Sequence, residues 1–184
     1  MTRDQAEALL KEYVAGDRML NHCYAAEAVM RALARRLDED EEKWAMAGLL
    51  HDIDIEVTDA DLTRHGLEAQ KILTRNNVDP EVIDAIVMHN EIVSGRKRNT
   101  PFQHALAAGE TITGLIVATT LVYPEKKLAS VKTKSIVKRM KEKAFAASVN
   151  RDIIMECEQI GIPLNEFAEL SLTAMRDISD TLGL

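Results

Sequence analysis

The stretch GLLHDID, Gly48–Asp54, ends an apolar helical run by placing His51 and Asp52 side by side, with Asp54 two residues later. The periodic apolar residues before it predict a helix that stops here. A carboxylate near the C-terminal end of a helix is disfavoured by the partial negative charge of the exposed carbonyl groups. The polar residues that close this helix therefore require a compensating positive charge.

The composition of the whole chain favours one helical, water-soluble domain. Of the 184 residues, 46% are apolar and only 4% are aromatic, which favours helices over strands around one core. The net charge of −7 argues against a general nucleic-acid-binding surface. There is no apolar stretch of signal-peptide type, and the longest apolar run, Gly114–Tyr123, is too short to span a bilayer. Because Cys23 and Cys157 lack CxxC spacing, we expect reduced, buried thiols in a cytoplasmic protein.

Capping residues and apolar periodicity, with no sustained period-two alternation, predict an all-α fold. Thr2, Asp79 and Thr100 are expected N-caps, and the last two precede a proline at the first helical position. The acidic cluster Asp38–Glu42 is expected to open a helix that ends near Asp54. We expect helices at 3–15, 18–37, 38–54, from 59 to 76–77, at 80–93 and 101–121, and two or three more in 132–183. All belong to one predicted domain, residues 1–184.

Four of the predicted helices carry one polar side chain on an otherwise apolar face. These side chains are His22, His65, His89 and Glu110. His65, for example, is expected on a helical face with Leu62, Ala69 and Ile72. His104 is the one histidine on a less apolar face. With His51 and Asp52, the sequence thus offers six potential ligands.

A metal site explains these six residues better than separate structural roles do. Singly, each histidine could be a hydrogen-bonded core residue, Asp52 a turn residue, and Glu110 the partner of a lysine or arginine. Jointly these roles are costly, because each unsatisfied buried polar group costs roughly 1–3 kcal/mol. A divalent metal satisfies all six and supplies positive charge. Four imidazoles and two carboxylates without a thiolate favour Fe, Mn, Co, Ni or Zn, as one ion or as two that share a carboxylate.

The order of these residues resembles the HD-domain superfamily of metal-dependent phosphohydrolases, most closely its small stand-alone members. The resemblance covers nearly the whole chain. It is carried by the ordered ligands and by the segments GLLHDID, RHGLEAQKIL, VIDAIVMHNE, TPFQHALAAGETITGLIVA and KEKAFAASVNRD. It implies a helical bundle with a central metal site, formed by helices within about 18–121 and followed by C-terminal helices at about 132–183.

The resemblance also implies how the ligands divide. Asp52 would bridge two ions, the first held with His22, His51 and residue 110, and the second with His65 and His89. Two positions depart from the family pattern. Glu110 stands where the family usually has Asp, which shifts the carboxylate by roughly one C–C bond. Asn90 stands where relatives often carry histidine, and we expect it beside the ligands.

Metal-activated hydrolysis of a phosphate ester is the chemistry that such a site best supports. His51 and Asp52 are the expected catalytic residues, and Asp54 is a candidate for orienting a ligand or acting as a general acid. Glu56 is expected to face solvent. The substrate would be a small phosphorylated compound, with nucleotides among the candidates. The alternatives are a di-iron HD-type oxygenase and a non-catalytic nucleotide- or metal-binding module. Monomer and homodimer are equally compatible with the sequence.

Two basic segments are candidates for contact with a substrate phosphate. Residues 126–143 carry eight Lys or Arg against one acid. The side chains that we expect to reach a phosphate are Lys132, Lys134, Lys141, Lys143 and, beyond the segment, Arg151. An ordinary solvated helix face explains the segment equally well. The loop SGRKRNT, Ser94–Thr100, is expected either to close over the pocket or to be a plain exposed loop.

Overall fold

The computed structural model describes all residues, 1–184, and contains helices and turns but no strand, so the all-α prediction is confirmed. The helices are α1 (Arg3–Tyr13), α2 (Asp17–Leu37), α3 (Glu41–Leu50), α4 (Leu67–Arg75), α5 (Pro80–His89), α6 (Glu91–Ser94), α7 (Pro101–Leu121), η1 (Leu128–Ser130), α8 (Thr133–Met140), α9 (Arg151–Ile154), η2 (Met155–Ile160), α10 (Leu164–Asp177) and α11 (Ser179–Leu182).

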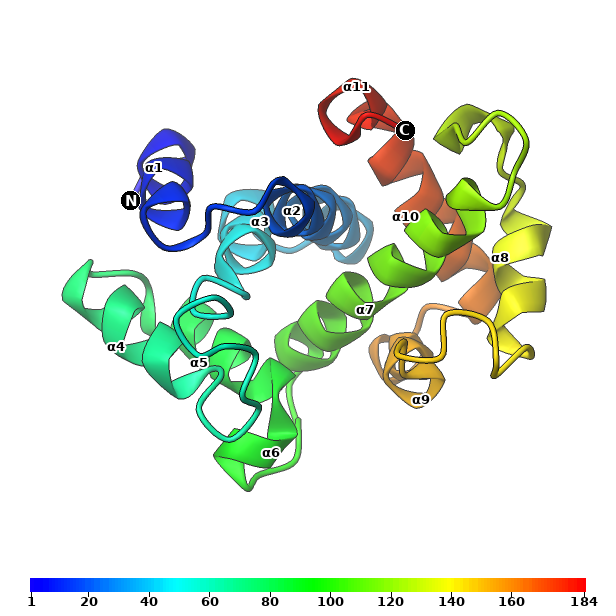
Figure 1. Cartoon of the computed structure of the whole chain (residues 1–184). Helices are drawn as coiled ribbons and strands as arrows, with labels where there is room; N and C mark the ends of the chain where they lie inside the picture. The colour runs from blue at the N-terminus through cyan, green and yellow to red at the C-terminus, as the bar shows by residue number, and fades with distance from the viewer.

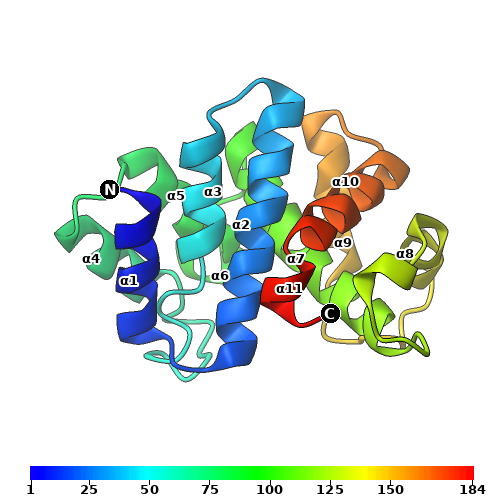
Figure 2. The ribbon, with the colours of Figure 1, turned by 90° about the horizontal axis from the view of Figure 1, so that it is seen from above.

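The two longest helices, α2 and α7, pack against each other in the middle of the molecule (Figure 1). Helix α3 packs along α2, and α5 packs against both α3 and α7. Helices α4 and α5 lie at one end of this central group and α8 lies at the other, as Figure 2 shows from above. A single cluster of 43 buried apolar residues connects these helices. None of them is both long enough and apolar enough to cross a membrane.

The three predicted N-caps are confirmed. Thr2 and Thr100 each form a capping box with the glutamine three residues later, and the Asp79 side chain accepts the N–H of Glu81. Pro80 and Pro101 occupy the first helical positions, where a missing N–H costs nothing. Local chemistry therefore determines where α1, α5 and α7 begin.

The acidic run and the segment after Asp59 differ from their predictions. Asp38 ends α2 in the left-handed conformation (φ 59°), and Asp40 caps α3, so only Glu41 and Glu42 lie in a first turn. The start predicted at residue 59 is wrong, because residues 51–60 and 62–66 are turns. Helix α3 therefore ends at Leu50 and not near Asp54, and α4 starts at Leu67, although it ends at Arg75 close to the predicted end.

The Asp54 carboxylate explains why α4 starts later than predicted. This side chain accepts the N–H groups of Gly66 and Ala69, at 2.7 and 2.9 Å, and so anchors the first turn of α4. Gly66 has φ 98°, a conformation that favours glycine. His65 therefore lies in a turn before α4 and not on a helical face with Leu62 and Ala69, as predicted.

The helix predicted over 80–93 divides at Asn90. The Asn90 amide donates to the carbonyl oxygens of Leu62 and His65, at 2.7 and 2.9 Å, and its side-chain oxygen accepts the N–H of Ile92. These bonds end α5 at His89 and cap the short helix α6. The prediction that Asn90 lies beside the ligands agrees with this position.

Gly48 allows α3 to approach α2 closely, and we predict that Gly48→Ala destabilises the protein. A Cβ at Gly48 would lie 2.5 Å from the backbone oxygen of Ala26, so one helix must shift. We expect a loss of about 1–3 kcal/mol in the free energy of unfolding, measured by urea denaturation. Gly114→Ala is the matched control, because its new Cβ would meet only the Val149 side chain, at 3.3 Å. Equal effects of the two substitutions would contradict this explanation.

Candidate metal centre

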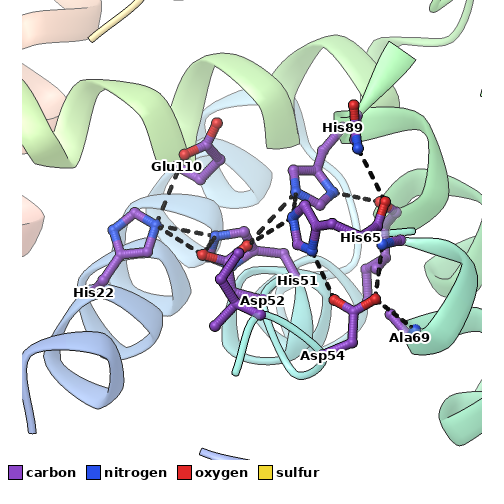
Figure 3. A network of polar contacts seen from close by, with 12 residues as sticks. His22, His51, Asp52, Asp54, His65, Ala69, His89 and Glu110 are labelled. Atoms are coloured by element: carbon purple, nitrogen blue, oxygen red, sulfur yellow. Dashed lines mark hydrogen bonds and ion pairs between the residues drawn. The ribbon is translucent and has the colours of Figure 1, made fainter. Parts of the chain in front are cut away.

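The predicted ligands converge from five separate parts of the chain (Figure 3). Their positions are His22 on α2, His51 and Asp52 just after α3, His65 in the turn before α4, His89 at the end of α5, and Glu110 on α7. His104 lies outside the group, as predicted, and its Nδ1 is 2.7 Å from Glu156.

Asp52 lies at the centre and directs one carboxylate oxygen to each of two histidine pairs. Its Oδ2 is 3.4 Å from His51 Nε2 and 3.6 Å from His22 Nε2. Its Oδ1 is 3.2 Å from His65 Nε2 and 3.6 Å from His89 Nε2. Two groups result, His22–His51–Asp52 and Asp52–His65–His89, each with its ligand atoms within 4.8 Å of one another. These groups correspond to the division that the sequence resemblance implies, except that residue 110 is absent from the first.

Neighbouring acceptors fix the orientation of all four imidazoles. His51 Nδ1 lies 2.8 Å from the Gly48 carbonyl, and His89 Nδ1 contacts the Ile86 carbonyl. His65 Nδ1 lies 2.7 Å from Asp54 Oδ1. Because these partners only accept, each Nδ1 is the donor.

The fourth imidazole, His22, is oriented through Thr113. The Thr113 hydroxyl donates to the Glu110 carbonyl at 2.6 Å, so its oxygen is free to accept from His22 Nδ1 at 3.1 Å. Each ring, when it is neutral, therefore presents an unprotonated Nε2 to the centre. This is the state in which imidazole binds a metal.

The Nε2 atoms face each other in pairs across the centre. The distance is 3.1 Å between His22 and His51, and 2.9 Å between His65 and His89. Two unprotonated nitrogens at this distance repel, so each pair requires either a proton on one ring or a metal ion. A metal ion satisfies both rings and the facing Asp52 oxygen at once, so the donor set is suited to a divalent transition metal.

Burial and the carboxylates set the charge of the centre. Burial raises the pKa of Asp52, but the nearby imidazoles outweigh it and hold this pKa well below its usual value. Burial lowers the pKa of His51 to about 3, so this ring is neutral. Burial also works against a charge on His65, but Asp52 and Asp54 raise its pKa to about 10. His65 is thus the imidazole that balances the carboxylates when no metal does.

Glu110 lies at the margin of the centre. Its Oε2 is 3.7 Å from His22 Nε2, and its Oε1 accepts a hydrogen bond from the Thr111 hydroxyl. It belongs to neither of the two compact groups. Burial raises the pKa of Glu110. Its role as a ligand of the first ion therefore stays a prediction.

Asp54 lies behind the centre and is fully buried. It accepts from His65 Nδ1 and from two backbone N–H groups, and these bonds outweigh burial and lower its pKa. Of the two roles considered for Asp54, this geometry corresponds to orienting a ligand. Glu56 is exposed in a turn, as predicted, and it also accepts the N–H groups of Ala15 and Gly16 at 3.0 and 2.9 Å.

The basic residues occupy two different environments. The side chains of Lys132, Lys134, Lys141 and Lys143 are exposed and form no ion pair. Arg151 instead donates from its Nη atoms to backbone carbonyls between residues 142 and 149. The Nη donors of Arg151 already have partners. We therefore expect Arg151 to support a phosphate site by holding this turn in place.

The centre opens on the side of His22 and Glu110. Their side chains are 23% and 18% exposed, whereas His51 and His65 are 1% and 4% exposed. Gly114 lies one turn beyond Glu110 on α7, and a Cβ added there would lie 3.3 Å from the Val149 side chain, so the turn held by Arg151 lies near this opening. A groove of about 950 Å³ lies between α1, α2, α10 and α11, and none of the six ligands lines it.

Sequence reasoning missed two residues that support the ligands. Thr113 orients His22 across 91 positions of sequence, and Arg98 turns inward to the end of α5. Both lie in segments that the sequence singles out, but their roles depend on contacts that only folding creates, so no local signal could have identified those roles.

Comparison with known proteins agrees with this geometry. A family model described as HD domain matches residues 19–144, which include all six predicted ligands. Comparisons with curated proteins and with solved structures returned no match. The chain therefore belongs to the HD-domain superfamily, whose members are metal-dependent hydrolases.

Proposed function

We propose that this protein is a phosphohydrolase that acts on a small phosphorylated compound, with nucleotides among the candidates. The observation that carries the proposal is the position of Asp52, which directs one oxygen to each of two histidine pairs. Such a centre suits two divalent ions that share a carboxylate, drawn from Fe, Mn, Co, Ni and Zn. When bound, such ions lower the pKa of water and neutralise negative charge on a phosphoryl group.

The chain supports this chemistry by holding its ligands in place before a substrate arrives. His51 and His65 are oriented by buried acceptors, the Gly48 carbonyl and Asp54, so neither ring needs to reorganise. The opening beside His22 and Glu110 gives a phosphate ester access from one side. Catalytic sites gain most of their effect from this kind of preorganisation.

We further propose that basic side chains beside the opening bind the substrate phosphate. Lys143 lies in the turn held by Arg151, next to the part of α7 that follows Glu110. Lys132 and Lys134 lie farther from the opening, at the start of α8 beside Tyr123, which follows the C-terminal end of α7. None of these lysines is neutralised by an acid of this chain. They therefore supply positive charge in a protein whose net charge is −7.

The effect of Lys143→Ala on KM tests this assignment. We expect KM to rise about two- to fivefold with little change in kcat, the size of one exposed ion pair. Lys126→Ala is the matched control, because Lys126 follows the C-terminal end of α7, roughly 16 Å along the helix from Glu110. A KM equal to that of the unchanged protein would remove Lys143 from the phosphate site.

The reaction class is tested by assaying the protein, loaded with each candidate metal, against a panel of phosphate monoesters, diesters and nucleotides. We expect metal-dependent release of phosphate or of a nucleoside monophosphate. Consumption of dioxygen by the iron-loaded protein without phosphate release would favour the di-iron oxygenase. Ligand binding without turnover of any compound, for every metal, would favour the non-catalytic module.

A further inference from the structure

Arg98 is a charged residue turned into the protein from an otherwise exposed basic loop. Its side chain is 4% exposed, whereas those of its loop neighbours Arg96 and Lys97 are 61% and 88% exposed. Those neighbours pair with surface acids, Asp84 and Glu91. Arg98 also lies 3.7 Å from Glu91, but its guanidinium is buried against groups that its neighbours do not contact, and the expected role of this loop as a lid does not explain this.

One side of the guanidinium binds the end of the helix that carries a predicted ligand. Arg98 Nη1 donates to the carbonyl oxygens of Met88 and His89, at 3.0 and 3.2 Å. These are the last two residues of α5, where carbonyl groups have no partner within the helix. The Arg98 side chain therefore supplies hydrogen-bond donors to the carbonyl groups of the turn that carries the His89 imidazole.

The other side of the guanidinium binds an acid from the C-terminal part of the chain. Arg98 Nε and Nη2 donate to the two carboxylate oxygens of Glu156, at 2.7 and 2.5 Å. His104 Nδ1 lies 2.7 Å from the same carboxylate. Glu156 lies in η2, beyond residue 144, where the match to the HD-domain model ends.

We propose that Arg98, held by Glu156, is a positioning residue that fixes His89 for metal binding. Through Glu156, η2 then supports the metal centre. The inference rests on the proposed metal site. A planar guanidinium can serve two carbonyls and a carboxylate simultaneously, whereas a lysine ammonium has no such fork. Loss of this contact frees the last turn of α5 and displaces one of the three ligands in the Asp52–His65–His89 group.

The test is titration of the full-length, metal-free protein with Co²⁺, followed by visible absorption and calorimetry, for Arg98→Lys and Glu156→Gln. We expect Co²⁺ affinity to fall about tenfold or more in Arg98→Lys, with a changed absorption spectrum. Glu156→Gln keeps an acceptor for Arg98, and we expect a smaller loss in the same direction. Arg96→Lys is the matched control and should bind Co²⁺ like the unchanged protein.

The outcomes separate this inference from the proposed function. If the unchanged protein binds no Co²⁺, the metal centre itself is wrong. If it binds Co²⁺ and both variants bind with the same affinity and spectrum, Arg98 has no positioning role, even where their unfolding temperatures fall. If Arg98→Lys does not fold, Glu156→Gln decides the question by the same two measurements.

Discussion

Replacing Asp52 by Asn should abolish activity and release metal without unfolding the protein. The carboxylate faces both histidine pairs, with distances of 3.2 to 3.6 Å to their Nε2 atoms, so its charge would serve both ions of the proposed centre. An amide of the same size keeps the shape but removes that charge. Metal ions contribute several kcal/mol to such reactions, and each 1.36 kcal/mol is tenfold in rate, so we expect kcat/KM to fall by about 10³ or more.

The experiment compares Asp52→Asn with Asp59→Asn, the same change at an exposed position seven residues along the chain. Asp59 has φ 52°, a conformation that Asn tolerates, so this control should keep its metal, its activity and its unfolding temperature. Hydrolysis at the normal rate by the Asp52 variant would remove this residue from the mechanism. His51→Ala should resemble Asp52→Asn, because His51 is the other buried member of the adjacent pair.

Asp54→Asn should weaken metal binding although Asp54 is not one of the predicted ligands. Its carboxylate accepts from His65 Nδ1 and from the N–H groups of Gly66 and Ala69. An asparagine amide offers only one accepting oxygen, so its NH₂ group would face at least one of these donors. His65 then loses its orientation or α4 loses its anchor. Partners of this kind are worth 10- to 100-fold in metal affinity, and we expect a loss near 100-fold because Asp54 supports both.

A metal titration of the Asp54→Asn variant, followed by calorimetry, measures this loss. Thr113→Val is a useful comparison, because it removes the acceptor that orients His22 in the other group. If Asp54 acted as a general acid instead, its variant would keep full metal affinity and lose only kcat. That result would contradict the orienting role.

The sequence predicted the fold and most of the residues that gather around Asp52, because both depend on local patterns. Caps such as Thr100 and apolar periodicity mark where helices begin and which face is buried. The same periodicity identified His22, His89 and Glu110 as polar residues on apolar faces. The adjacent pair His51–Asp52 then identified the place where they meet.

The parts that sequence could not predict depend on long-range contacts. The start of α4 is set by Asp54, which lies 12 and 15 positions before the two N–H groups that it accepts. In the sequence, Arg98 does not differ from the other basic residues of its loop, because its partner Glu156 lies 58 positions away. Glu56 likewise bonds a turn 40 positions earlier. Hydrogen-bond partners that are brought together only by folding leave no periodic or local signal.

The most direct test of the account is the metal content of the untagged protein, purified without chelators or added metal and measured by elemental analysis. We predict about two ions per chain of iron, manganese, cobalt, nickel or zinc, falling to one or none in Asp52→Asn. A content near zero, unchanged after reconstitution with manganese, iron and zinc, would contradict the account. The facing histidine pairs would then be held by protons alone, and the centre would be a buried hydrogen-bond network.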